Sequence, residues 1–152
     1  NHPERFEHVI VANTAAQIGL EQAWKDRASL VREQGLEPIA STAATRWFTE
    51  GFIKKNPKIV ARLSSELGDG SNEGYASCCE ALAKADLREE IKTISIPVLV
   101  IVGTQDPVTT VKDGQFMINN IRSSALFEID ASHISNIEQP QAFNKAIFDF
   151  IQ

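Results

Sequence analysis

Two side chains that can move protons stand at matching places in the second half of the sequence. Asp106 follows the apolar run 97–103, and His133 follows a second apolar run, 125–130. A carboxylate beside an imidazole fixes the tautomer of the ring and stabilises its protonated form. The imidazole can then take a proton from a nucleophile and return it to a leaving group. The pair therefore indicates acid–base chemistry of the kind used in hydrolysis.

Each of these residues alone also has an ordinary structural explanation. Asp106 precedes Pro107, and Asp-Pro is common in turns. His133 alone fits a hydrogen-bonded loop histidine. Taken together, the two residues favour a functional explanation over a structural one. Groups that follow successive parallel strands meet at the sheet edge where open α/β sheets bind ligands. His2 lies near a chain end and His8 precedes a strand, so both are poorer candidates.

The elements that must position this pair are strands buried on both faces. The runs 8–13, 97–103 and 125–130 are mostly apolar without strict alternation, apart from their polar ends and Glu128, and this pattern is typical of a parallel sheet. Helical spacing occupies 111–121 and 139–152, and the latter carries a regular apolar stripe. The order strand, helix, strand, helix predicts an α/β fold with a mostly parallel sheet and flanking helices.

The stretch 15–92 departs from this pattern, because it contains no convincing strand. Gly35 fits the C-cap of a first helix, and 38–48 fits a second helix. Asn56 and Pro57 predict the start of a third. We therefore predict an all-helical cap inserted between two strands. The expected segments are 1–14, with a core strand; 15–92, the helical cap; and 93–152, the C-terminal core.

Composition excludes several classes of partner. The chain has 152 residues with 43% hydrophobic and 23% charged side chains, a balance typical of globular proteins. A net charge of −5 without a Lys/Arg cluster argues against nucleic acid. No apolar run is long enough to span a membrane. The two cysteines are adjacent and poorly placed for a mutual disulfide, which suits a reducing compartment and predicts a cytoplasmic protein.

Several blocks of the sequence resemble the α/β-hydrolases, and more narrowly the 3-oxoadipate enol-lactonases. The acid and histidine motifs of that superfamily are similar to PVLVIVGTQDPVT at 97–109 and SHISNIEQP at 132–140. A third matching block is VIVANTAAQIG at 9–19. RWFT at 46–49 and EGY at 73–75 fit the helical cap of the same enzymes. The resemblance covers the whole chain but only about the second half of a family member.

The resemblance implies a catalytic triad of which two members are present. The order in α/β-hydrolases is nucleophile, acid, base, so Asp106 would be the acid and His133 the base. The family's Gly-x-Ser-x-Gly nucleophile motif does not occur in this sequence, and neither do its usual oxyanion-hole donors. Residues 1–6 look like the end of the helix that follows the nucleophile. We therefore expect the serine on an N-terminal half that lies outside this sequence, on the same or a separate chain.

The resemblance also implies a reaction, the opening of a small lactone that bears a carboxylate. No metal or organic cofactor is needed for it. Arg46, beside Trp47, is our candidate for binding the substrate carboxylate, because a guanidinium binds a carboxylate through two hydrogen bonds. The equal alternative is a surface arginine next to a tryptophan that packs inside the cap.

Two other functions stay open from the sequence. One scaffold hosts many chemistries, so another small-ester or carbon–halogen hydrolase is the first alternative. The second is a non-catalytic fragment that acts as an interaction module through its exposed strand edge. Such an edge favours association, and an oligomer is one way to cover it.

Overall fold

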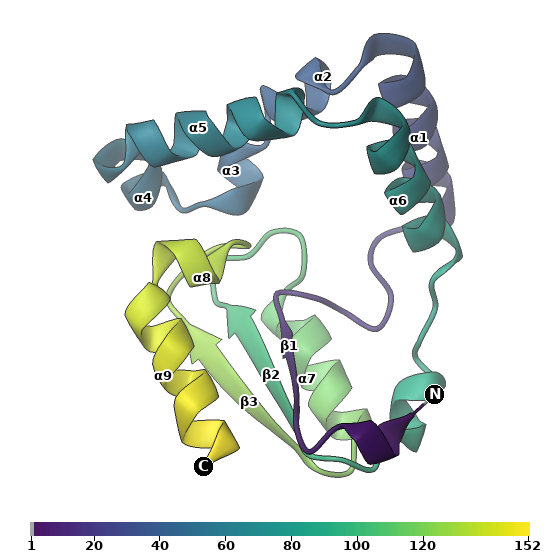
Figure 1. Cartoon of the computed structure of the whole chain (residues 1–152), viewed down its shortest axis with the longest axis vertical. Helices are drawn as coiled ribbons and strands as arrows, with labels where there is room; N and C mark the ends of the chain where they lie inside the picture. The colour runs from purple at the N-terminus through teal and green to yellow at the C-terminus, as the bar shows by residue number, and fades with distance from the viewer. Residues whose placement is uncertain (1) are drawn as a thin grey trace. The chain divides into compact units, whose positions relative to one another are not determined.

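The computed structural model describes residues 2–152, and Asn1 lies outside the described residues (Figure 1). It divides into two compact units, which we call the sheet unit and the helical unit. The sheet unit comprises the chain up to Ala16 together with Asp86–Gln152, and the helical unit comprises Gln17–Ala85. In the predicted segment 1–14, a 3-10 turn at Pro3–Arg5 precedes the first strand.

The sheet unit is built on three parallel strands in the order β1-β2-β3. They are β1 (Val9–Ala12), β2 (Val98–Gly103) and β3 (Ser124–Ile129). β2 pairs with both neighbours, and all six of its residues are buried. A strand that is covered on both faces and paired on both edges has no place for a polar side chain, which explains its continuous apolar run. The prediction of a parallel sheet is confirmed.

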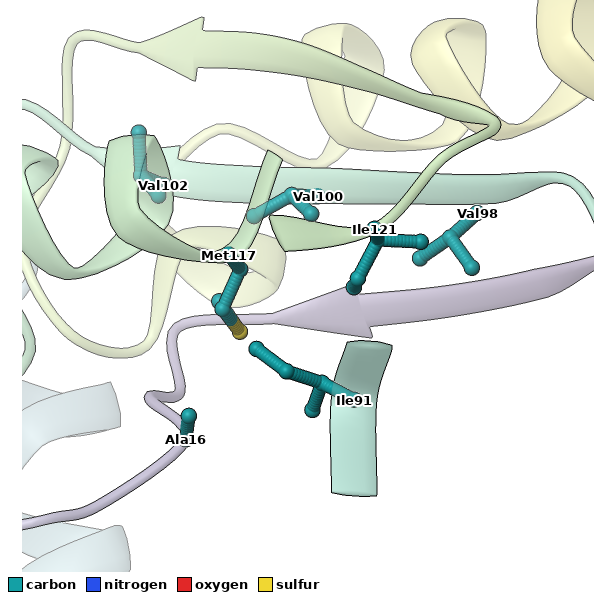
Figure 2. Packing of buried hydrophobic residues seen from close by; sticks show 7 residues of the cluster. All are labelled: Ala16, Ile91, Val98, Val100, Val102, Met117 and Ile121. Atoms are coloured by element: carbon teal, nitrogen blue, oxygen red, sulfur yellow. The ribbon is translucent and has the colours of Figure 1, made fainter. Parts of the chain in front are cut away.

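Helices cover both faces of this sheet (Figure 1). On one face, β2 packs against α7 (Val111–Asn120). The contact joins Val98, Val100 and Val102 of the strand to Met117 of the helix and to Ile121, which directly follows it (Figure 2). On the other face, alternate residues of β2 pack against α9 (Pro140–Ile151). Two short helices, η2 (Glu90–Thr93) and α8 (Ser135–Glu138), complete the unit. The α/β class predicted from the sequence, with helices flanking the sheet, is confirmed.

The helical unit contains six helices among the described residues. They are α1 (Glu21–Gln34), α2 (Glu37–Ala40), α3 (Ala44–Trp47), α4 (Glu50–Lys55), α5 (Pro57–Gly68) and α6 (Asn72–Lys84). The buried residues between α1 and α6 include Ala28, Ala76 and Cys79, whose small side chains let the two helices approach closely. Gly35 ends α1 with a φ of 76°, as expected for a glycine C-cap.

The predicted single helix over 38–48 is wrong, because a turn at 41–43 divides it into α2 and α3. The Thr42 hydroxyl donates to the carbonyl of Ile39 at 3.3 Å, and the Ser41 hydroxyl donates to that of Pro38 at the same distance. Such local side-chain bonds compete with helical ones. The turn therefore coincides with two hydroxyl residues whose side chains bond the carbonyls of the preceding turn.

The helical unit is narrower than the predicted 15–92. Leu87 N donates to Ala16 O at 2.8 Å, and Ile91 lies in the core of the sheet unit. The chain has therefore returned to the sheet unit at Asp86. Within residues 2–152, none of the helices has the length and apolar character needed to cross a membrane.

Candidate active site

The loops after β2 and β3 lie against each other at the carboxyl edge of the sheet. Thr104 N donates to Ile129 O at 2.8 Å, and Gln105 N donates to Ala131 O at 3.0 Å. A Cβ on Gly103 would lie 2.4 Å from Ser132 O, well inside van der Waals contact. Glycine at the end of β2 is therefore what lets the two loops approach this closely.

Asp106 and His133, predicted from the sequence to meet at this edge, are brought together. His133 Nδ1 lies 2.8 Å from Asp106 Oδ2. The Asp106 side chain is 0% exposed and that of His133 is 25% exposed, so the carboxylate is buried while the ring reaches solvent. An ionised carboxylate only accepts hydrogen bonds, so Nδ1 carries the proton and donates it. The basic lone pair is then on Nε2.

The Asp106 carboxylate is held by several donors besides the imidazole. Its Oδ1 accepts from Val108 N at 2.7 Å and from Thr109 N at 3.0 Å, and its Oδ2 accepts from the Thr109 hydroxyl at 2.8 Å. Burial alone would raise the pKa of Asp106, but the hydrogen bonds from His133, Thr109 and Val108 outweigh it and lower this pKa to about 2. The site therefore keeps a permanent negative charge beside the imidazole.

Sequence reasoning missed Asn13, which follows β1 at the same sheet edge. Its Nδ2 donates to Asp106 Oδ2 at 3.2 Å and to Ser132 O at 3.3 Å, and its Oδ1 accepts from the Ser135 hydroxyl at 2.5 Å. Glu138 also contributes, since one of its carboxylate oxygens accepts from Ser132 N at 3.0 Å. Asn13 comes at the end of an apolar run, and Asp106 and His133 each follow one. That shared position is the sequence signal that could have identified Asn13 as a site residue.

The predicted substrate-binding residues, Arg46 and Trp47, lie on α3 of the helical unit, and both are half-buried. The Arg46 guanidinium donates to the Thr42 hydroxyl at 3.1 Å and to Ile39 O at 3.3 Å. Burial lowers the pKa of Arg46, and the nearby positive charge of Arg27 lowers it further. The Trp47 ring meets Phe48 edge-on, with 6.5 Å between centroids. A substrate-binding role for Arg46 and Trp47 stays a prediction.

Metal ligands were not predicted from the sequence. Over residues 2–152, no group of three or more His, Cys, Asp or Glu side chains is placed to hold a metal ion.

Comparison with known proteins finds strong similarity in sequence, although no family model matches the chain. The sequence is 68% identical over 145 residues to 3-oxoadipate enol-lactonase 2 of Acinetobacter baylyi. It is 45% identical over 148 residues to 3-oxoadipate enol-lactonase 1 of the same species. These alignments cover 95% and 97% of this chain but 54% and 56% of the relatives. The chain therefore spans about half the length of the curated relatives it matches.

The fold of this chain is also similar to that of a solved structure. The crystal structure of the enol-lactonase from Burkholderia xenovorans LB400 matches with a TM-score of 0.95 and 40% sequence identity. The match covers 99% of this chain and 58% of that one. The similarity thus extends over both units described above.

Proposed function

The chain belongs to the α/β-hydrolase superfamily, whose C-terminal part it reproduces, and from this we propose that it supplies the acid and base of a lactone hydrolase. The proposed substrate is the enol-lactone of 3-oxoadipate, a small lactone that bears a carboxylate. The observation that carries the proposal is the 2.8 Å contact between His133 Nδ1 and Asp106 Oδ2. It is supported by the 68% identity to a protein named for this activity.

In the proposed mechanism, a serine from a segment outside the given sequence is the nucleophile. His133 Nε2 takes the serine proton while the serine oxygen attacks the lactone carbonyl carbon. The ring C–O bond then breaks, the enol oxygen leaves with the proton from His133, and the enol becomes a ketone. Water, deprotonated by the same imidazole, next attacks the acyl-enzyme, releasing 3-oxoadipate and the free serine.

Asp106 stays ionised throughout this cycle. Its pKa of about 2 leaves it charged at neutral pH, so it stabilises the imidazolium that forms in each half of the reaction. It also holds the proton on Nδ1, which keeps the lone pair on Nε2. The buried carboxylate therefore orients and charges the base without itself taking a proton.

Arg46 and Trp47 are our proposed contacts for the substrate. A half-buried guanidinium is less hydrated than one in water, and this strengthens its hydrogen bonds to a carboxylate. The lowered pKa of Arg46 reflects the same burial. We also propose a cytoplasmic location, because Cys78 and Cys79 are both free thiols.

The decisive experiment is an assay of the complete natural protein that contains this chain. Its intact mass, with a search for a companion polypeptide, identifies the segment that carries the nucleophile. We expect hydrolysis of the enol-lactone, and much slower hydrolysis of a neutral lactone of the same ring size, of simple esters and of haloalkanes.

Each other outcome points to a different function. Faster turnover of an ester or a haloalkane would replace the lactone as substrate. No turnover of any substrate, combined with binding to another protein, would make the chain an interaction module. Hydrolysis by material that contains only residues 1–152 would show that the nucleophile has been assigned to the wrong segment.

A further inference from the structure

We propose that Asn13 is a positioning residue that fixes the acid loop and the base loop of the site to each other. Its single amide bonds the Asp106 carboxylate on one side and the backbone and side chain around His133 on the other. The proposal rests on the proposed function, since it gives Asn13 a task in that same site.

The amide uses both of its ends. Nδ2 has two hydrogens and two acceptors, Asp106 Oδ2 at 3.2 Å and Ser132 O at 3.3 Å. Oδ1 accepts from the Ser135 hydroxyl. Ser132 directly precedes His133, and Ser135 follows it by two residues, so the amide holds the loop on both sides of the imidazole. Three adjacent strands thus each contribute one part of the site.

The groups around the amide are buried, and burial makes their geometry strict. Counting backbone and side chain together, Ser135 is 0% exposed, Ser132 2% and Asp106 6%. When a buried polar atom loses its hydrogen-bond partner, the free-energy cost is much larger than for an exposed atom, because an exposed atom can form a hydrogen bond to water instead. An arrangement that shifts these atoms apart is therefore costly, and the amide restricts Asp106 and the His133 loop to one relative placement.

The backbone of Asn13 explains why asparagine suits this position. Its φ is 47°, in the left-handed region that few residues other than glycine adopt, and asparagine is one of them. Asn13 N still donates to Ile101 O at 2.9 Å, so the chain turns immediately after the last bond of the strand pair. Glycine would fit this backbone without the amide. Aspartate would fit the shape but would place a second carboxylate against Asp106.

The bond of Asn13 to Oδ2 links it to the reaction, because Oδ2 is also the atom that accepts from His133 Nδ1. Rotation of the carboxylate away from the imidazole would break both bonds. Asn13 contacts the acid and the loop of the base, with substrate binding assigned to other residues. Its loss is therefore expected to lower kcat and to leave KM nearly unchanged.

The test uses the complete protein with the variants Asn13→Gly, Asn13→Asp and Ser135→Ala. Asn13→Gly keeps the backbone freedom and should lower kcat by about 10- to 100-fold, with KM within about twofold of wild type. Asn13→Asp, which has nearly the same shape, should lower kcat further because two carboxylates then face each other. Ser135→Ala, which removes the donor to Oδ1 but keeps the amide, should have a smaller effect.

A second readout needs no substrate. The proton on His133 Nδ1, bonded to a buried carboxylate, should give a sharp downfield resonance in the proton NMR spectrum of the wild-type protein. We expect this resonance to broaden or disappear in Asn13→Gly. The matched control is Asn120→Ala, whose amide donates to a carbonyl of its own helix, Phe116 O at 2.8 Å, on α7. This control should match the wild type in both readouts.

The proposal is overturned if Asn13→Gly keeps the wild-type kcat and the downfield resonance. It is also overturned if Tm falls in Asn13→Gly while the resonance and kcat persist, since Asn13 would then support only the fold. If Asn13→Gly fails to fold, Ser135→Ala decides by the same two readouts. A complete protein that does not open the lactone would refute the proposed function, whereas the resonance would still decide the role of Asn13.

Discussion

The sheet unit and the helical unit use polar side chains in opposite ways. In the sheet unit, hydrogen bonds join residues far apart in the sequence, such as Asn13 to Asp106 and Asp106 to His133, and these bonds are partly buried. In the helical unit, Arg32 pairs with Glu73 and Glu80, and all three side chains are substantially exposed. Water and salt weaken such surface pairs, whereas a buried network is strongly coupled. The proton transfer that we propose is therefore assigned to the sheet unit.

The hydrophobic cores of the two units also differ in how much they bury. The sheet unit buries a whole strand, β2, between two helical layers. The helical unit buries smaller clusters where short stretches of its helices meet, such as the one between α1 and α6. A tightly packed core cannot absorb a change in side-chain volume without strain. Substitutions of similar size should therefore lower the stability more in the sheet unit than in the helical unit. The four predictions that follow test this difference.

The largest effect is expected for Asp106→Asn in the complete protein. An asparagine at this position can donate to the imidazole and favour the wrong tautomer, so kcat should fall by about 10³- to 10⁴-fold. His133→Ala should abolish turnover. The matched change in the helical unit, Glu80→Gln, replaces an exposed carboxylate and should leave kcat unchanged. A kcat for Asp106→Asn within tenfold of wild type would contradict the catalytic assignment.

The next largest effect is expected from Gly103→Ala. The new Cβ would lie 2.4 Å from Ser132 O and 2.6 Å from Ala131 O, so the backbone of the base loop must move. The free energy of unfolding should fall by about 3 kcal/mol. In the helical unit, a Cβ on Gly51 meets nothing within 4 Å, and Gly51→Ala should change stability by less than about 0.5 kcal/mol. Chemical unfolding of both variants measures the difference, and equal losses would refute it.

A smaller effect concerns acid stability. The pKa of Asp106 is lowered from 3.8 to about 2 in the folded protein. A lowered pKa stabilises the fold above the unfolded pKa, so this contribution, about 2 kcal/mol, is complete above about pH 4 and is lost as the pH falls toward 2. Unfolding free energies measured across this range should fall more steeply for wild type than for Asp106→Asn. Parallel curves would mean that the buried carboxylate gains nothing from its donors.

Surface carboxylates of the helical unit provide the contrast for this measurement. The Arg32 guanidinium lowers the pKa of Glu73 and of Glu80 by direct hydrogen bonds. Because these groups are exposed, added salt should suppress their part of the acid dependence. The part that belongs to Asp106 should persist at high salt.

The smallest effect is expected for Arg46→Ala. Loss of a cation that binds the substrate carboxylate should raise KM by about tenfold with little change in kcat. Arg46→Lys keeps the charge without the planar pair of donors, so it should recover only part of the affinity. Steady-state kinetics with the charged and the neutral lactone measure this. An unchanged KM for Arg46→Ala would exclude Arg46 from the substrate site.

Much of the sheet unit was predictable because its signals are repetitive. Three mostly apolar runs predicted all three strands, and the residues that follow two of these runs pointed to Asp106 and His133. These inferences need only the period of the pattern and the rule that parallel strands end at one edge. Burial on both faces is complete only for β2; β1 is half-buried, and β3 carries the polar Glu128 and is partly exposed.

The remaining features depend on single contacts that no period reveals. Thr42 lies in the turn that divides a stretch of helical composition, where its hydroxyl bonds the preceding carbonyls. Asn13 acquires its importance from a left-handed φ and from partners more than ninety residues away along the chain. Such contacts form only after the strands are paired. The sequence therefore predicts the frame of the site better than the side chains that hold it together.

The hydrogen bond from Leu87 N to Ala16 O has a consequence for engineering. It joins the two points where the chain leaves and re-enters the strand layer, so excising everything between them leaves ends that a very short linker can connect. The entropy of closing a loop grows only logarithmically, by about 0.6 kcal/mol for each doubling of length. Segments of quite different size can thus be grafted between Ala16 and Leu87 while the strand register is preserved.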